Sequence, residues 1–280
     1  MTDFDPPVTA VREVVRRALA EDLGGLGDLT SIAVVPTEAR GVGRFVARQA
    51  GVVAGTAAAA EVCRQVDADV TCRWSLADGD AVGGGDQLGR VEGSVRSILV
   101  AERTALNLLC HCSGVATLTR RFVDAIAGTS ARIRDTRKTL PGLRALEKAA
   151  VRAGGGFNHR ESLSDAVLIK DNHLAHLPLR DAVEIARARW PGRIVEVECD
   201  TLEQVTEAKV AGPDLVLLDN MTPHDVAEAV AALGGAAPVE VSGGVDVERA
   251  RGYAEAGADF ISVGAITHSA PVLDIALDLD

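Results

Sequence analysis

The sequence of 280 residues has fewer basic than acidic side chains, 29 against 40, and it has no long apolar run and no CxxC motif. Its formal net charge of −11 disfavours nucleic acid and anionic membrane surfaces as partners. The longest uncharged segment, Thr104–Thr119, contains Asn107 and His111, and it is shorter than the roughly 20 apolar residues of a membrane span. The N-terminus shows no secretory signal. We therefore expect a cytoplasmic protein that binds neither nucleic acid nor membrane.

Scarce cysteine and lysine exclude two further classes. The chain has five cysteines, an odd number without a CxxC pair, which predicts reduced thiols. Cys110, His111 and Cys112 are consecutive, and three neighbours on one helix do not converge on a tetrahedral metal centre. The first lysine is Lys138. The glycine-rich stretch at 78–93 therefore lacks the modifiable lysine that a biotinyl or lipoyl carrier needs.

The hydrophobic pattern changes along the chain and predicts two domains. Before residue 94, a helical period at 8–23 and short strand-like pieces at 43–48, 70–74 and 87–91 indicate an α+β domain. A helical pattern follows from 94 to 126. Beyond it, six aliphatic runs recur, most of them separated by an amphipathic helix: 132–135, 166–172, 194–199, 215–220, 239–244 and 260–265.

This spacing is typical of β/α units with parallel strands that are apolar on both faces. Six units predict an incomplete β/α barrel and leave room for a seventh strand, with an open doubly wound sheet as the alternative. In either architecture ligands bind at the carboxyl ends of the strands. The polar residues that end each run are therefore the candidate site.

Cations gather at the first of these ends. Residues 132–171 carry nine cationic and five anionic side chains, although the whole chain is acidic. Arg137, Lys138 and Lys170 lie at or just beyond strand ends, which favours an anionic substrate. The alternative is a solvated charged face.

Acids and glycines mark the later strand ends. Glu198 and Asp219 could bind hydroxyl groups or magnesium, or stabilise developing positive charge, and barrel-mouth salt bridges are the alternative. The segments Ser242–Gly244 and Val263–Ala265 have glycines that let backbone N–H groups approach a phosphate. Turns also use glycine, so one such segment is weak evidence for a phosphate site. Two in succession are stronger evidence.

The motifs together resemble the quinolinate phosphoribosyltransferase family, within the type II phosphoribosyltransferases. The likeness runs from about Glu21 to the C-terminus and is most specific between Asp135 and His173. The motifs are DTRKTLPGLRALEKAAVRAGGGFNHRESLSDAVLIKDNH, ERTALNLLCHCSG, VEVEC, LLDNM, VEVSGGV and FISVGAITHSAP.

The resemblance implies an α/β fold with two domains. An N-terminal α+β sandwich domain would span residues 1–108, with residues 270–280 packing back onto it. An incomplete, about seven-stranded β/α barrel would span residues 109–269. The family also implies a homodimer in which Arg103 of one subunit reaches into the active site of its neighbour.

The implied reaction joins quinolinate to 5-phosphoribosyl-1-pyrophosphate, with Mg²⁺, and gives nicotinate mononucleotide, pyrophosphate and CO2 in de novo NAD biosynthesis. The family places these residues around quinolinate: Arg103, Thr136, Arg137, Lys138, His159, Arg160 and Lys170. It places Glu198 and Asp219 at the ribose hydroxyls and the metal, directly or through water. The 5-phosphate would bind to Ser242, Gly243, Gly244, Val263, Gly264 and Ala265, with His268 nearby.

The chemistry of these residue types agrees with those roles. Arginine forks match the carboxylates of quinolinate, and lysine acts as a point charge. Once ribosylated, the ring nitrogen is a pyridinium that accepts the electrons released with CO2, so no organic cofactor is required. We expect Glu198, Asp219 and Lys138 to be catalytic. Lys138 would position the departing carboxylate or help reprotonate the ring carbon.

Three other functions remain open at this stage. Another pyridine phosphoribosyltransferase of the same fold would act on nicotinate or a similar ring. A Schiff-base lyase would use Lys170 as its nucleophile, because barrel aldolases place a lysine at a strand end. A ligand-binding protein without catalysis is the third.

Overall fold

The computed structural model describes residues 5–280, so the first four residues of the expected N-terminal domain lie outside it. The chain forms two compact units. The first runs to Arg120 and also takes in Thr139–Gly155 and Ala265–Asp280. The second comprises Arg121–Lys138 and Gly156–Gly264. Residues 109–120, 139–155 and 265–269, which were expected in the barrel, thus lie in the first unit.

The first unit contains an antiparallel sheet in the order β12-β1-β5-β3. Its strands are β1 (Arg40–Ala47), β3 (Thr71–Trp74), β5 (Gln87–Ser94) and β12 (Ile275–Leu279). Strand β12 pairs with β1 from Gly43↔Leu279 to Ala47↔Ile275, so the C-terminus forms an edge of this sheet. A second, two-stranded sheet pairs β2 (Gly51–Val52) with β4 (Ala81–Val82).

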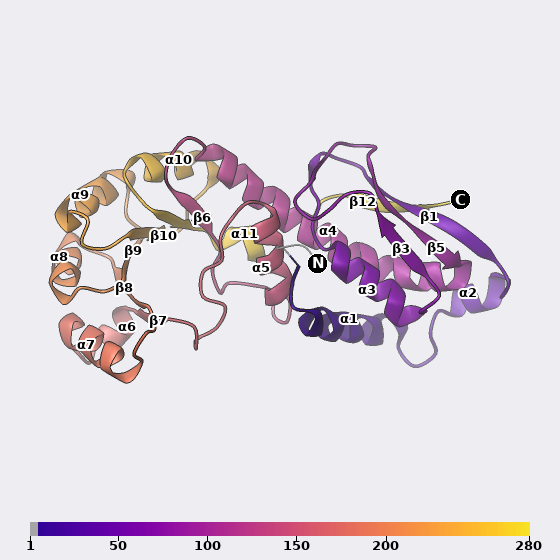
Figure 1. Ribbon diagram of the computed structural model, residues 1–280, viewed down its shortest axis with the longest axis horizontal. Coiled ribbons are helices and arrows are strands. Elements are labelled where there is room, and N and C mark those ends of the chain that lie inside the picture. Colours follow the sequence, from indigo (N-terminus) through magenta and orange to yellow (C-terminus); the bar gives the residue numbers. More distant parts are fainter. Residues whose placement is uncertain (1–4) are drawn as a thin grey trace. The chain divides into compact units, whose positions relative to one another are not determined.

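Helices accompany the sheet in the same unit (Figure 1). They are α1 (Val8–Leu23), α2 (Leu29–Val34), α3 (Thr56–Val66), α5 (Arg144–Ala153), α11 (Ala265–His268) and most of α4 (Val95–Ala125). Helix α1 buries Val11, Val15 and Leu19, which recur every four residues and form one apolar face. Asp28 caps the N-terminus of α2, because its side chain accepts hydrogen bonds from the backbone N–H groups of Thr30 and Ser31.

The second unit is built on a parallel sheet of six strands in the order β6-β11-β10-β9-β8-β7. The strands are β6 (Arg132–Arg134), β7 (Val167–Ile169), β8 (Val195–Cys199), β9 (Leu215–Asp219), β10 (Val239–Ser242) and β11 (Phe260–Ser262). The order is that of a barrel opened between β6 and β7. Among the described residues, the seventh strand is reduced to one parallel bridge between Arg134 and Phe157, so the α/β class is confirmed without a closed barrel.

Helices follow the strands of this unit, as Figure 1 shows. They are α6 (Asp171–Leu174), α7 (Leu179–Arg189), α8 (Leu202–Ala211), α9 (Pro223–Leu233) and α10 (Val247–Glu255). Local sequence sets where two of them begin. Thr201 with Gln204 caps α8, and Thr222 with Asp225 caps α9. Each helix therefore starts within a few residues of a strand end and leaves only a short loop at the mouth of the sheet.

Strands β8 and β10 are not apolar on both faces, and this corrects the expectation from the sequence for these two strands. Successive side chains of a strand point to opposite faces. In β8, Val195 and Val197 alternate with Glu196 and Glu198, and in β10 Glu240 sits between two buried valines. The aliphatic face packs on helices, whereas the interior face carries charge.

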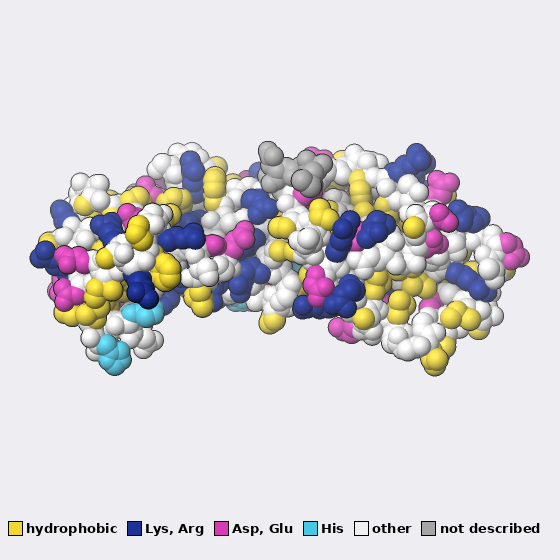
Figure 2. All heavy atoms as spheres, turned by 60° about the horizontal axis from the view of Figure 1, so that its bottom comes forward, with side chains coloured by type: hydrophobic (Ala, Val, Ile, Leu, Met, Phe, Trp, Pro, Cys, Tyr) yellow, Lys and Arg dark blue, Asp and Glu magenta, His cyan; other side chains and the backbone are white. Residues whose placement is uncertain are grey.

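The surface carries both signs of charge. On the face drawn in Figure 2, basic and acidic side chains are interspersed with hydrophobic ones, without one large patch of either sign. Within residues 5–280 no helix is long and apolar enough to cross a membrane. The cytoplasmic location stays a prediction. All five cysteines are free thiols, as expected.

Candidate active site

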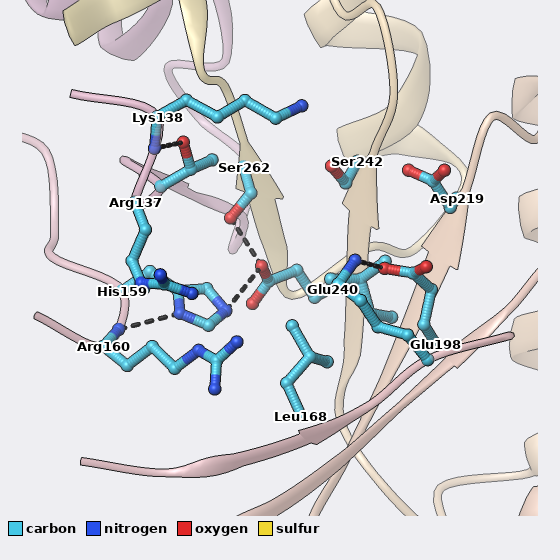
Figure 3. A pocket seen from close by; sticks show the side chains of 13 residues that line it. Arg137, Lys138, His159, Arg160, Leu168, Glu198, Asp219, Glu240, Ser242 and Ser262 are labelled. Carbon is cyan, nitrogen blue, oxygen red and sulfur yellow. Dashed lines mark hydrogen bonds and ion pairs between the residues drawn. The ribbon is translucent and has the colours of Figure 1, made fainter. Parts of the chain in front are cut away.

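A pocket of about 240 Å³ opens at the carboxyl ends of the parallel strands (Figure 3). All the residues that line it belong to the second unit. They are Thr136, Arg137, Lys138, His159, Arg160, Leu168, Lys170, Glu198, Leu217, Asp219, Glu240, Ser242 and Ser262. The structure therefore brings together most of the residues predicted to bind quinolinate and both predicted carboxylates.

The period of the strands explains this convergence. Glu198, Leu217 and Glu240 are register partners across β8, β9 and β10. Two residues further along, Asp219 is the partner of Ser242. Because residues two apart in a strand share a face, these side chains form successive layers on the interior face of the sheet.

Four cations line the pocket. Arg137 and Lys138 follow β6, where the Lys138 N–H donates to Thr136 Oγ1 over 3.0 Å. Arg160 donates from Nη1 to the Ala166 carbonyl over 3.0 Å. Burial, and then the nearby charge of Arg137, lower the pKa of Arg160. The pocket thus holds two guanidinium groups that repel each other and that a doubly charged anion would stabilise together.

The carboxylates end the neighbouring strands β8 and β9. Glu198 has a side chain that is 10% exposed and forms an ion pair with Lys170. Asp219 ends β9 and accepts a hydrogen bond from Asn220 Nδ2 over 2.6 Å. In Figure 3, Arg137, Arg160 and His159 lie on one side of the pocket, and Glu198, Asp219 and Ser242 lie on the other.

Glu198, Asp219 and Asp200 each offer a carboxylate oxygen, and these oxygens lie within 4.8 Å of one another. Oxygen ligands of this kind suit Mg²⁺, so the donor set fits the expected metal. Asp200 was not predicted as a site residue from the sequence. Its signal is its place directly after the buried strand end at Cys199, in the loop before α8.

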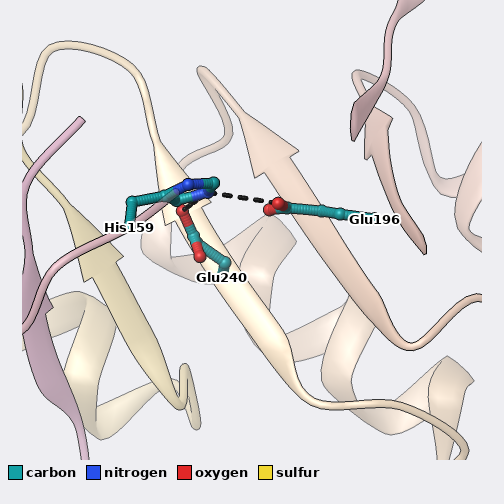
Figure 4. A group of neighbouring side chains, drawn as sticks. All are labelled: His159, Glu196 and Glu240. Atoms are coloured by element: carbon teal, nitrogen blue, oxygen red, sulfur yellow. Dashed lines mark ion pairs between the residues drawn. The ribbon is translucent and has the colours of Figure 1, made fainter. Parts of the chain in front are cut away.

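A buried charged cluster of His159, Glu196 and Glu240 forms part of the pocket wall, which His159 and Glu240 line (Figure 4). His159 Nε2 is 3.1 Å from Glu196 Oε2 and 3.3 Å from Glu240 Oε1. Burial lowers the pKa of His159, but the hydrogen bonds to Glu196 and Glu240 outweigh it and raise the pKa to about 9. The backbone N–H of Arg160 donates to His159 Nδ1 over 2.7 Å. Because a protonated Nδ1 could not accept this hydrogen bond, the contact opposes the rise in pKa.

Glu196 and Glu240 were not predicted as site residues, although the sequence carries a signal for both. Each lies in the middle of an aliphatic run, VEVEC or VEVS. A carboxylate inside a buried strand requires a partner from elsewhere in the fold, so a charge at that position is itself a signal.

The predicted phosphate segments are only partly in this unit. Ser242 lines the pocket, and Gly243 and Gly244 follow it with φ values of 99° and 56°. Val263 and Gly264 come after β11 in the second unit, whereas Ala265 and His268 belong to α11 in the first unit. The phosphate roles stay predictions.

Arg103 does not line the pocket. It is an exposed residue of α4 in the first unit. Its predicted place in the active site of a partner subunit also stays a prediction.

Comparison with known families shows to which family the chain belongs. Residues 28–113 match the family model of the quinolinate phosphoribosyl transferase N-terminal domain, and residues 115–278 match that of the C-terminal domain. The chain belongs to the quinolinate phosphoribosyltransferase family. The family resemblance drawn from the sequence motifs is confirmed.

Curated relatives match nearly the whole length of the chain. The Mycobacterium leprae protein named nicotinate-nucleotide pyrophosphorylase (carboxylating) is 47% identical over 96% of this chain and 97% of its own length. The chloroplastic Arabidopsis thaliana protein of the same name is 38% identical, over 98% of this chain and 84% of its own.

Solved structures of the family have the same fold. The nicotinate-nucleotide pyrophosphorylase from Francisella tularensis superposes with a TM-score of 0.93 at 38% identity, and covers 99% of this chain and 98% of its own. The protein of that name from Ehrlichia chaffeensis gives 0.92 at 38% identity, over 96% of this chain and 98% of its own.

Proposed function

We propose that the protein is a decarboxylating quinolinate phosphoribosyltransferase. It would convert quinolinate and 5-phosphoribosyl-1-pyrophosphate into nicotinate mononucleotide, pyrophosphate and CO2. The observation that carries the proposal is the convergence of four cations, Arg137, Lys138, Arg160 and Lys170, on the pocket that also contains Glu198 and Asp219. Relatives at up to 47% identity carry the matching name.

The cations would hold quinolinate by its two adjacent carboxylates. Arg137 and Arg160 offer planar forks that match a carboxylate, and Lys138 and Lys170 add point charges. One charge pair about 4 Å apart is worth on the order of 4 kcal/mol at an effective dielectric near 20, before desolvation. Gripping both carboxylates would leave the ring little freedom and would aim its nitrogen at the anomeric carbon of the ribose.

Glu198 and Asp219 would act on the sugar. As pyrophosphate leaves, the anomeric carbon becomes oxocarbenium-like, and the cations that hold quinolinate would oppose that charge. Carboxylates on the opposite side of the pocket offset this effect and can accept hydrogen bonds from the ribose hydroxyls. Glu198 is held by its ion pair with Lys170. This one contact would therefore orient a residue that binds quinolinate, Lys170, and a residue that binds the sugar, Glu198.

Mg²⁺ fits the same carboxylates. Glu198, Asp219 and Asp200 would hold it, directly or through water, because their oxygens lie within 4.8 Å of one another. Bound there, the metal would neutralise charge on the pyrophosphate.

Lys138 is the candidate for the decarboxylation step. It lies at the rim of the pocket, exposed, with its backbone fixed by Thr136. Its ammonium group would position the departing carboxylate or deliver a proton to the ring carbon. The ribosylated ring accepts the electrons itself.

The active form would be a homodimer in which Arg103 of one subunit completes the site of its partner. The support is that Arg103 is exposed on α4 in the first unit and is not among the residues that line the pocket of the second unit.

A single assay tests the function. Purified protein is supplied with quinolinate, 5-phosphoribosyl-1-pyrophosphate and Mg²⁺, and the mononucleotide and CO2 are measured. We expect both products in equal amounts and neither when one reagent is omitted. Turnover of nicotinate without CO2 release would instead indicate another pyridine phosphoribosyltransferase.

The Schiff-base alternative has less support. Lys170 forms an ion pair with Glu198, whereas a Schiff-base lysine is activated in an apolar setting or beside another cation. Substrate-dependent trapping of Lys170 by borohydride would favour the lyase and contradict the proposal.

A further inference from the structure

The interior of the parallel sheet contains two carboxylates that the proposed reaction does not use. Glu240 in β10 is fully buried, and Glu196 in β8 is 2% exposed. An unpaired buried carboxylate is strongly unfavourable, and a paired one still requires well-placed hydrogen bonds. The groups that satisfy Glu240 therefore indicate what this residue does.

Glu240 joins four parts of the second unit. Its Oε2 accepts from Arg134 Nη1 of β6 over 2.5 Å. Its Oε1 accepts from Ser262 Oγ of β11 over 2.5 Å, and it lies 3.3 Å from His159 Nε2 in the loop before β7. Burial raises the pKa of Glu240, but His159 and Arg134 outweigh it and lower the pKa. A carboxylate in the wall of an anion pocket would repel the substrate unless its own partners compensated it, as they do here.

His159 is held at both ring nitrogens by the protein. Nε2 faces Glu196 and Glu240, and Nδ1 accepts the N–H of Arg160 over 2.7 Å. The backbone N–H of His159 in turn donates to Asp135 Oδ1 over 2.8 Å. The imidazole therefore fixes the direction in which the chain continues toward Arg160, and Glu196 and Glu240 together hold the imidazole.

We propose that Glu240 is a positioning residue for quinolinate binding, which acts through His159 to hold Arg160 against the substrate. The inference rests on the proposed function of the pocket. It also gives His159 a positioning role, because the ring links Glu240 to the Arg160 backbone. Both ring nitrogens already contact groups of the protein when no substrate is bound.

The test uses Glu240→Gln in the full chain, with Glu207→Gln on the exposed face of α8 as the matched control. Quinolinate binding is measured by calorimetry without the second substrate, and kcat and both KM values are measured in the full assay. We expect at least a tenfold rise in the Kd and KM for quinolinate, with the KM for 5-phosphoribosyl-1-pyrophosphate within twofold of the wild type. Glu207→Gln should change none of them.

A role in stability alone would give a different result. The melting temperature and the fraction of active protein would fall, while the quinolinate Kd of the folded fraction stayed unchanged, and that outcome overturns the proposal. If wild-type protein binds no quinolinate, the proposed function fails and the positioning role fails with it. If the wild type binds and Glu240→Gln binds equally well, only the positioning role fails.

A second variant and a spectroscopic readout cover the case in which Glu240→Gln does not fold. Ser262→Ala removes one donor to Glu240 and keeps its charge, and we expect a two- to fivefold rise in quinolinate Kd. The Nε2–H proton of His159, assigned by its loss in His159→Gln, should appear far downfield in wild-type NMR spectra and move upfield in Ser262→Ala. An unchanged resonance together with an unchanged Kd overturns the proposal.

Discussion

At the scale of single residues, exposure separates side chains that act on the substrate from those that hold others in place. Lys138 is exposed at the rim of the pocket, whereas His159 and Glu240 are buried in its wall. An exposed lysine has a long stem with several rotatable bonds, whereas a buried carboxylate is held by its surroundings. Substitutions at these two kinds of residue should therefore change different kinetic constants.

Lys138→Ala should lower kcat at saturating substrates by roughly 100-fold, the size of a general-acid contribution. Its melting temperature should stay within a degree or so of the wild type, because truncating an exposed side chain changes stability little. Steady-state kinetics and thermal unfolding measure both quantities. Lys209→Ala, at an exposed lysine on α8, is the control. Wild-type turnover in Lys138→Ala would exclude a chemical role for this lysine.

At the scale of elements, the loops after β9 and β10 are built against each other. Asn220 has a φ of 57°, and its N–H donates to the Ser242 carbonyl over 3.0 Å. A Cβ added at Gly243 would lie 2.3 Å from Asn220 Oδ1 and 2.6 Å from Asn220 N. Gly243 therefore allows the loop beside Asp219 to approach the predicted phosphate segment.

Gly243→Ala should raise the KM for 5-phosphoribosyl-1-pyrophosphate at least tenfold and leave quinolinate binding nearly unchanged. The left-handed φ costs about 1–2 kcal/mol for alanine, and the overlap adds about 1–3 kcal/mol. Gly235→Ala is the control, because Gly235 has a φ of 81° and no atom within 4 Å of an added Cβ. Urea unfolding and kinetics on both variants separate strain from overlap. Equal loss in the two variants would rule out the contact with Asn220 as the cause.

At the scale of the whole molecule, the proposed dimer can be tested by complementation between two inactive variants. Arg103→Ala and Lys138→Ala each remove one part of the same proposed site, but from opposite subunits. A mixed dimer would contain one site with both residues intact and one site with neither.

We expect the two nearly inactive variants to regain activity when their subunits are exchanged. Random exchange between symmetric dimers should restore about a quarter of wild-type turnover, since half of the dimers are mixed and each has one intact site. The variants are mixed under mild denaturant, dialysed and assayed. Each variant alone, treated in the same way, is the control. No recovery despite proven exchange would place Arg103 in the site of its own subunit or outside any site.

The sequence by itself determined what local chemistry controls. Apolar periods predicted most strands and helices, and the polar residue after each run marked a strand end. The caps at Thr201 and Thr222 are equally local, because each forms within three residues, although they were not predicted. The run of motifs between Asp135 and His173 also identified the family.

Only the tertiary structure decided which charges meet. Arg134 and Glu240 are 106 residues apart in the chain, and Lys170 and Glu198 are 28 apart. Their pairing follows from the order and register of parallel strands that are distant in sequence. The glutamates inside VEVEC and VEVS are visible in the sequence, but their partners are not. Alternation is local, whereas the face that points inward is decided only when the six strands align side by side.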